Sequence, residues 1–170
     1  LQRAVFRPNE DALPRYRAYV EEETTYRLDQ SRVVVVEGRI VGHLRVWERT
    51  IRVRGEKLRA AGIGSLLTLP EYRGRGIARA LLEDTENYLL ESDYDLGLLF
   101  TIIGTPYYEA LGWTVIPLPM FEVELSDEAE APREANRVRH LVPDRDLQAV
   151  ASIYDQCARD MTGAEVRLPD

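Results

Sequence analysis

The sequence has 170 residues and a formal net charge of −7, with 45% hydrophobic and 30% charged residues. This composition is typical of a folded globular protein and argues against disorder, and the negative charge argues against nucleic-acid binding, because phosphate contacts need a basic surface. No apolar run approaches the roughly 18 residues of a membrane span. A single cysteine, Cys157, excludes an internal disulfide and fits a reducing cytoplasm, and with only two distant histidines it argues against a zinc site.

The first half of the chain predicts strands joined by tight turns. Glu37-Gly38 lies between two apolar runs and predicts a hairpin, and Arg54-Gly55 marks a second turn. The apolar residues of the long strand between these turns change from even to odd positions, which predicts a bulge or break near Glu48. His43 on this strand could do chemistry, but a plain sheet-face histidine is the simpler interpretation. The strands expected in this half are Arg3–Arg7, 33–36, 39–53 and 58–69, with a helix beginning at Asn9-Glu10-Asp11 after the first of them.

A loop of glycines and arginines at residues 73–76 joins the apolar strand to a helical pattern. N–H groups at a helix start are unpaired and favour anions, glycines allow close approach, and arginines add charge-assisted bonds to phosphate. The loop is neither a P-loop nor a dinucleotide fingerprint, because neither Gly-Lys-Ser/Thr nor a third glycine follows. The pattern therefore predicts a phosphate site of another kind, and the alternative is an ordinary basic turn.

The second half predicts one more buried strand and then a change of composition. The strand is expected at 96–100, and a short helix follows between Pro106 and Gly112, which mark its limits. Two closing strands are expected at Trp113–Ile116 and Met120–Leu125. Residues 127–137 are acidic and polar, as in a linker. A strand at 138–141 and a helix after Asp144 then repeat the opening scheme.

The glycine-arginine loop resembles motif A of the GNAT acetyltransferases, Gln/Arg-x-x-Gly-x-Gly/Ala, through Arg73, Gly76 and Ala78. The resemblance implies an α/β (or α+β) fold, with a mixed sheet splayed between its fourth and fifth strands and helices on both faces. It also implies that acetyl-coenzyme A is the co-substrate, with no metal. Its pyrophosphate would be held by Arg73, Gly74, Arg75, Gly76, Ile77 and Ala78, and its pantetheine arm by backbone groups of Leu66, Leu67 and Thr68.

A second segment resembles the Tyr-x-x-Leu/Phe-Gly-aromatic sequence that GNAT proteins carry after the fifth strand. Tyr108, Leu111, Gly112 and Trp113 occupy its positions. In that family the tyrosine points at the coenzyme sulfur and often acts as a general acid, so the resemblance implies that Tyr108 is catalytic. A neutral tyrosine can donate a proton at neutral pH, because its pKa is near 10. Core packing is the alternative, and Tyr107 is a distant second candidate.

The layout of nearly the whole chain resembles the N-terminal part of the Eis-like (enhanced intracellular survival) family. This resemblance implies a GNAT domain at 1–126, a linker at 127–137 and the start of a second, truncated GNAT-like domain at 138–170. Members of that family acetylate amines, many form hexamers, and their C-terminal carboxylate enters the first active site as a base. The Leu-Gln-Arg-Ala start without methionine is typical of a trimmed chain.

The combined expectation is a cytoplasmic N-acetyltransferase that moves acetyl directly from acetyl-coenzyme A to an amine of a small molecule or peptide. The strand before the loop offers no base, since it carries Ala60, Ala61 and Gly62, so a water chain or a group beyond residue 170 would take the amine proton. A non-catalytic acyl-coenzyme A-binding or regulatory module is the first alternative. A structural domain with an accidental loop is the second. The sequence indicates no single acceptor, and no nucleic acid or membrane partner is expected.

Overall fold

The computed structural model describes residues 17, 21, 26–101, 103–117 and 139–167. The elements in chain order are η1 (Leu28–Gln30), β1 (Ser31–Val36), β2 (Arg39–Val53), β3 (Glu56–Thr68), η2 (Pro70–Tyr72), α3 (Ile77–Glu91), β4 (Leu96–Leu99), α4 (Pro106–Glu109) and α5 (Pro143–Ala158). The strands expected at Arg3–Arg7 and Met120–Leu125 and the linker at 127–137 lie outside the described residues. Of the helix expected after Asn9, the structure describes Arg17 and Glu21, which are both helical.

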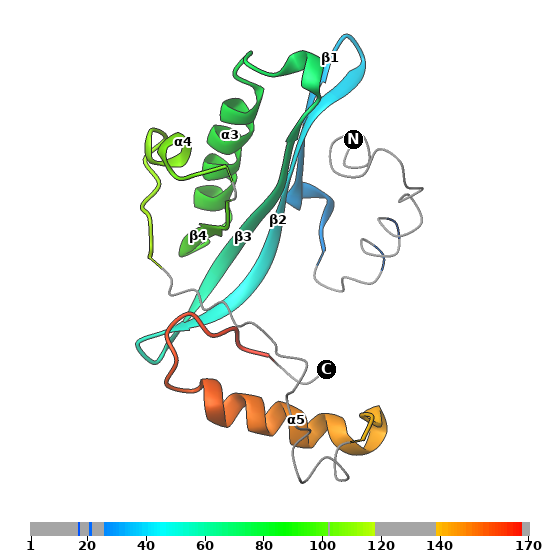
Figure 1. Cartoon of the computed structure of the whole chain (residues 1–170), viewed down its shortest axis with the longest axis vertical. Helices are drawn as coiled ribbons and strands as arrows, with labels where there is room; N and C mark the ends of the chain where they lie inside the picture. The colour runs from blue at the N-terminus through cyan, green and yellow to red at the C-terminus, as the bar shows by residue number, and fades with distance from the viewer. Residues whose placement is uncertain (1–16, 18–20, 22–25, 102, 118–138, 168–170) are drawn as a thin grey trace, which may run out of the picture.

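The four strands form one mixed sheet in the order β1-β2-β3-β4. β1 and β3 pair with β2 in the antiparallel sense, and β4 runs parallel to β3. α3 lies along one face of this sheet (Figure 1). The expected fold class, a mixed sheet flanked by helices, is confirmed.

Two tight turns connect the first three strands. Glu37 and Gly38 have φ values of 50° and 78°, and Arg54 and Gly55 have 51° and 86°. Left-handed conformations at both central positions are those of the type I′ turn, whose twist matches that of the flanking strands. Both expected hairpin turns are therefore present.

The core lies between β2, β3 and α3. Val41, Leu44 and Val46 of β2 are fully buried, as is Leu82 of α3. Each such side chain contributes roughly 1.5–3 kcal/mol by leaving water. Gly42 allows α3 to approach β2 closely, because a Cβ at this position would lie 2.6 Å from Cγ2 of Ile77.

β2 runs unbroken past Glu48, so the break expected there is wrong. Its pairing with β3 is regular from Arg45 onward, and the irregularity lies between His43 and Arg45. The apolar residues of β2 change from one face of the sheet to the other along the strand, because different segments of the chain cover the two faces at its two ends. Val46 lies in the core with α3, whereas Ile51 lies beside the C-terminal segment.

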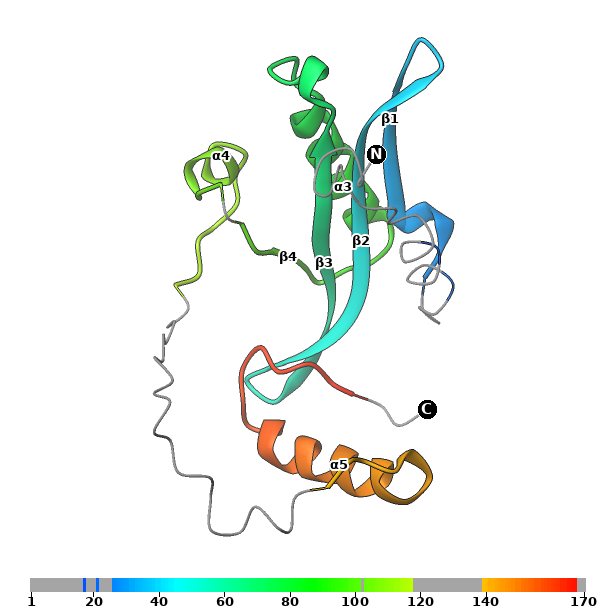
Figure 2. The same ribbon diagram turned by 45° about the vertical axis from the view of Figure 1, so that its right-hand side comes forward.

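β3 and β4 pair over only four residues and then separate. Ala60–Ile63 pairs with Leu96–Leu99, while β3 continues to Thr68 beside β2. Figure 2 shows β4 turning away from β3 toward α4. β3 and β4 correspond to the fourth and fifth strands expected from the sequence, so this divergence is the expected splay. β4 is shorter than expected, because it ends at Leu99 and Phe100, which is 88% exposed, lies outside it. It is also less buried than expected, because all of its residues are half-buried.

Two further expected strands are absent from the described residues. Residues 113–117 and 139–142 have no strand conformation, so the strands expected at Trp113–Ile116 and 138–141 are wrong for their described parts. A strand needs a neighbour with which to exchange hydrogen bonds, and none of the described strands pairs with either segment. Trp113 is held instead by its side-chain contacts and by a backbone hydrogen bond to Tyr108.

The chain after α5 returns antiparallel along the outer half of β2. The Arg52 N–H donates to the Ala164 carbonyl at 2.8 Å, and the Val166 N–H donates to the Thr50 carbonyl at 2.7 Å. Nη2 of Arg52 also donates to Oδ1 of Asp155 at 2.6 Å. The segment occupies a strand edge that is free because β1 pairs only with the first half of β2. α5 itself is the helix expected after the linker.

Candidate functional site

The loop between β3 and α3 presents backbone N–H groups at the start of a helix. Gly74 and Gly76 have φ values of 74° and 79°, in the left-handed region that glycine adopts without steric cost. Gly76 precedes the first turn of α3, and its carbonyl accepts the Ala80 N–H at 2.9 Å. N–H groups in a first turn have no partner within their helix, and this turn has no acidic residue. The loop is therefore suited to binding an anion.

Two exposed arginines add charge to the loop. Nε of Arg73 donates to the Thr68 carbonyl at 3.4 Å. The guanidinium of Arg75 lies 5.1 Å from the ring centroid of Tyr72. Neither contact neutralises its cation, whereas Arg79 in the first turn of α3 is paired with Glu83 at 2.7 Å. Arg73 and Arg75 can therefore contact an anion above the loop without breaking an ion pair.

The end of β3 leads directly into this loop, and beyond Ile63 no described strand pairs with the backbone edge that faces β4. Leu67 points into the core and is 3% exposed. The Thr68 carbonyl accepts a bond from the Arg73 side chain, and so faces away from β2. The Thr68 hydroxyl oxygen is buried and has no hydrogen-bond partner among the described residues. A buried polar atom without a partner is uncommon.

Tyr108 lies in the short helix α4 beyond β4. It is half-buried and packs against the core cluster, as do Leu66 of β3 and Tyr72 of the loop. The Trp113 N–H donates to the Tyr108 carbonyl at 3.1 Å. The Trp113 ring lies against β4 at Gly97, where a Cβ would be 3.1 Å from the ring. The turn after α4 is thus fixed to the sheet and holds Tyr108 beside the splay.

Tyr107 is the more exposed neighbour of Tyr108. Its ring meets that of Tyr108 edge to face, with 5.2 Å between centroids. Burial, followed by the proximity of Tyr108, raises the pKa of Tyr107, and the charge of Arg79 partly opposes this. This region is linked to α3 by the bond from the Trp113 indole N–H to Glu86, at 2.8 Å. The structure shows no hydrogen bond between Tyr108 and the loop at 73–78 within the described ranges.

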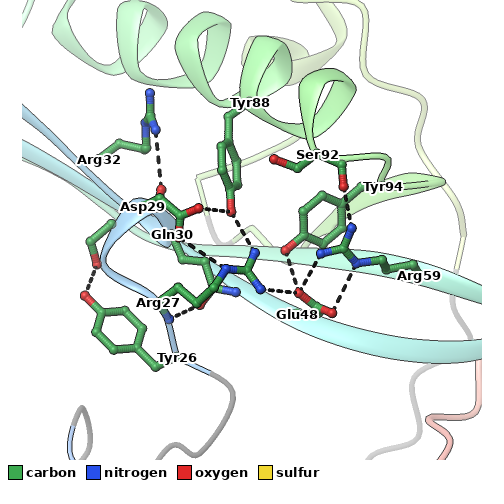
Figure 3. A network of polar contacts seen from close by, with 11 residues as sticks. Tyr26, Arg27, Asp29, Gln30, Arg32, Glu48, Arg59, Tyr88, Ser92 and Tyr94 are labelled. Carbon is green, nitrogen blue, oxygen red and sulfur yellow. Dashed lines mark hydrogen bonds and ion pairs between the residues drawn. The ribbon is translucent and has the colours of Figure 1, made fainter.

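A polar network that the sequence did not indicate lies near the C-terminal end of α3 (Figure 3). The Glu48 carboxylate accepts bonds from Arg59 at 2.9 and 3.1 Å, from Tyr94 at 3.0 Å and from Arg27 at 3.1 Å. These bonds, chiefly those from Arg59, lower the pKa of Glu48 to about 2. A carboxylate held ionised in this way is a poor proton acceptor near neutral pH. Its role is structural.

His43 also makes a contact that its place in the sequence did not indicate. Nδ1 lies 3.2 Å from the carbonyl oxygen of Ser65 on β3. Burial lowers the pKa of His43 more than this bond raises it, so the ring is neutral at pH 7. No group of three or more His, Cys, Asp and Glu residues in the described ranges could hold a metal ion. None of the helices in those ranges is long and apolar enough to cross a membrane.

Comparison with known proteins places these features in a family. The family model described as "Acetyltransferase (GNAT) domain" matches residues 1–116. The solved GCN5-related N-acetyltransferase from Kribbella flavida is 23% identical, with a TM-score of 0.57 over 65% of this chain and 28% of its own. A probable N-acyltransferase from Enterococcus faecalis is 15% identical, with a TM-score of 0.61 over 89% of this chain and 41% of its own.

A third solved structure was determined with a ligand that includes coenzyme A. AAC(6')-Iy, in complex with the bisubstrate analogue CoA-S-monomethyl-acetylneamine, is 19% identical, with a TM-score of 0.58 over 74% of this chain and 88% of its own. At such identities these structures support the fold. The chain spans less than half the length of the Kribbella and Enterococcus proteins.

Proposed function

The chain belongs to the acetyltransferase (GNAT) family, and from this premise we propose that it transfers an acetyl group directly from acetyl-coenzyme A to an amine of a small molecule or peptide. Acyl transfer follows from the family. The acetyl donor and the amine acceptor are the proposal. One observation carries it: the Arg73–Ala78 loop and the start of α3 adjoin the open edge of β3 where β4 diverges.

The residues present fit coenzyme A as co-substrate. The N–H groups after Gly74 and Gly76, with Arg73 and Arg75, would bind its pyrophosphate, and Ile77 and Ala78 begin the helix that supports them. The backbone groups of Leu66 and Thr68, which face away from β2, would hydrogen-bond the pantetheine arm, whereas those of Leu67 face His43 of β2. Bound acetyl-coenzyme A supplies an activated thioester. The AAC(6')-Iy complex with a coenzyme A analogue supports the donor class.

Tyr108 is proposed as the general acid. When the amine nitrogen attacks the thioester carbon and the C–S bond breaks, the departing sulfur carries negative charge, and the phenol would donate its proton to it. The half-buried position of Tyr108 beside the splay supports this role. General acid catalysis of this kind contributes on the order of 10²–10⁴-fold.

The amine must lose a proton to attack, and the described residues offer no free base on β3. Ala60, Ala61 and Gly62 have no ionisable side chain, and Glu48 on the neighbouring strand is engaged by Arg59 and Tyr94. We therefore assign this proton to a chain of water molecules or to a group that the described residues do not supply. The same observation favours the second candidate function, a coenzyme A-binding module that transfers nothing.

The Eis-like subfamily and its domain arrangement are also proposed. In this arrangement residues 1–126 form the acetyltransferase domain, 127–137 the linker and 138–170 the start of a second such domain, and the protein assembles as a homo-oligomer. The match of the Enterococcus protein over 89% of the chain extends past residue 126 and supports a longer arrangement. The backbone bonds between β2 and the chain after α5 support docking of the second unit on the first.

Release of free thiol from acetyl-coenzyme A tests this proposal. The protein is assayed with spermidine and with neamine as probe acceptors, beside Tyr108→Phe and the matched control Tyr107→Phe. We expect acceptor-dependent thiol release that falls about 10²-fold in Tyr108→Phe and less than threefold in Tyr107→Phe. Full turnover in Tyr108→Phe would remove this residue from the mechanism. Coenzyme binding without thiol release for either acceptor would favour the binding module.

A further inference from the structure

The irregular pairing of β2 with β3 is a bulge located at the point where the sheet opens. Gly64 lies opposite Arg45, and Leu67 lies opposite His43. Two residues of β3, Ser65 and Leu66, therefore face the single residue between these partners on β2. A bulge of this kind bends its strand and redirects the backbone groups that follow it. The pairing of β3 with β4 ends at Ile63, two residues earlier.

The bulge holds Ser65 in an unfavourable conformation. Its φ is 50°, in the left-handed region, where a residue with a Cβ costs of order 1–3 kcal/mol unless its surroundings fix it. Along the regular part of the ladder, every second carbonyl of β3 accepts a hydrogen bond from a backbone N–H of β2. The Ser65 carbonyl is instead met by the His43 side chain, with 3.2 Å between Nδ1 and the oxygen.

The chemistry of this contact fixes the tautomer of His43. A carbonyl oxygen can only accept, so Nδ1 carries the hydrogen and donates it. In the neutral ring Nε2 is then unprotonated. His43 thus bridges the gap that the additional residue leaves in the ladder, as a backbone donor does elsewhere along the strand.

We propose that His43 is a positioning residue that holds the Ser65–Leu66 bulge, and thereby aims the backbone of Leu66–Thr68 at the thioester end of bound acyl-coenzyme A. The proposal rests on the function proposed above, because it assigns the bulge to the donor site. The bond to Ser65 compensates for the strain of its φ. Without that bond β3 would relax toward a regular ladder, and the groups at Leu66 would turn away from the open edge.

Two variants separate positioning from proton transfer. His43→Ala removes the donor, whereas His43→Asn places an amide N–H the same number of bonds from the backbone as Nδ1–H, without a titrating group. In the unliganded protein we expect faster amide exchange over residues 64–68 in His43→Ala and near-normal exchange in His43→Asn. A two-bond ¹H–¹⁵N spectrum of the wild-type protein should identify the Nδ1–H tautomer.

Measurements of ligand binding and turnover then test whether the bulge orients the backbone of Leu66–Thr68 toward the thioester. We expect His43→Ala to bind coenzyme A within about threefold of wild type, to lose any additional affinity for acetyl-coenzyme A, and to lose on the order of 10²-fold in kcat with spermidine or neamine, because misplacement by about 1 Å can cost that much. His43→Asn should recover most of each loss. Adding Ser65→Gly, which removes the cost of a positive φ, should reduce the effect of His43→Ala.

Unchanged exchange and unchanged kcat in His43→Ala would overturn the proposal. Equal losses in both variants, with the acid limb of the pH–rate profile abolished, would also overturn it and would identify His43 as a base. If wild-type protein binds neither coenzyme form, the proposed function fails, and with it the assignment of the bulge to a thioester. The exchange data would still report whether His43 holds Ser65. The two failures are therefore distinguishable.

Discussion

Trp113 donates its indole N–H to the Glu86 carboxylate over 2.8 Å, and so joins the turn after α4 to the middle of α3. The same ring packs on Gly97 of β4. One side chain thus connects three elements that meet beside the splay. The position of Tyr108 depends on this connection, because the Trp113 N–H also donates to the Tyr108 carbonyl.

Trp113→Phe should loosen the turn without emptying the core. A phenyl ring fills most of the indole volume but cannot donate to Glu86, so we expect a loss of about 1 kcal/mol in the free energy of unfolding. Turnover should fall, because Tyr108 would be displaced. Coenzyme A affinity should stay within about twofold, because the contacts that the structure describes for Trp113 lie outside the Arg73–Ala78 loop that is proposed to bind the coenzyme. Urea unfolding and thiol release measure the two effects. Glu86→Gln, which keeps an acceptor, is the control and should behave as wild type. A stable Trp113→Phe protein with full turnover would contradict this role.

Acid should weaken the fold through Glu48. Its pKa is lowered from 4.5 to about 2 in the folded chain, chiefly by Arg59, so the ionised carboxylate favours folding above the unfolded pKa. That contribution is lost as the pH falls from about 4.5 toward 2. After allowance for solvent screening of a partly exposed group, it amounts to about 1–2 kcal/mol.

Glu48→Gln should therefore be less stable than wild type at pH 7, and the difference should shrink as the pH is lowered through 4 toward 3. Urea unfolding at fixed pH values between 7 and 3 gives this profile. Glu83→Gln removes a half-exposed carboxylate paired with Arg79 and should change stability by less than about 0.5 kcal/mol. A Glu48→Gln deficit that is independent of pH would show that packing, not charge, is lost.

Gly42→Ala should disturb the start of α3. The new methyl would lie 2.6 Å from Cγ2 of Ile77 and 3.2 Å from Cδ1 of Leu81, so we expect about 1–3 kcal/mol of destabilisation. It should also weaken coenzyme A binding, because Ile77 follows the loop directly. Gly62→Ala is the matched control, since its Cβ would be 3.5 Å from the nearest atom, the Trp47 carbonyl oxygen. Thermal unfolding measures the stability of both variants, and calorimetric titration measures their affinity for coenzyme A. Equal effects of Gly42→Ala and Gly62→Ala would contradict the predicted clash with Ile77.

Sequence patterns predicted the features that depend on neighbouring residues. The two hairpins follow from glycines at positions that require positive φ, and the loop before α3 follows from Gly74 and Gly76 for the same reason. The divergence of β3 from β4 was predicted only through family resemblance, because nothing local to Ile63 or Leu99 ends their pairing.

Features that depend on distant contacts were missed or misplaced. The bulge lies at Ser65–Leu66 rather than near Glu48, because a change of apolar positions also arises when different segments cover the two faces of a strand. Glu48 bonds to Arg59, 11 positions further along the chain, and to Tyr94, 46 positions further along. No local sequence pattern predicts partners at such separations. The strand expected at Trp113–Ile116 failed because β-propensity cannot supply a pairing partner.

A calorimetric titration of the protein with acetyl-coenzyme A, beside the Arg73→Ala/Arg75→Ala variant, tests the central claim most directly. The matched control is Arg139→Ala/Arg145→Ala, which removes the same charge near α5, where both arginines contact Asp146. We expect micromolar binding by wild type, a loss of about 10²-fold in the loop variant from two charge-assisted contacts, and a change below about threefold in the control. Wild-type protein that binds no acetyl-coenzyme A, or a loop variant that binds it as tightly as wild type, would contradict the claim.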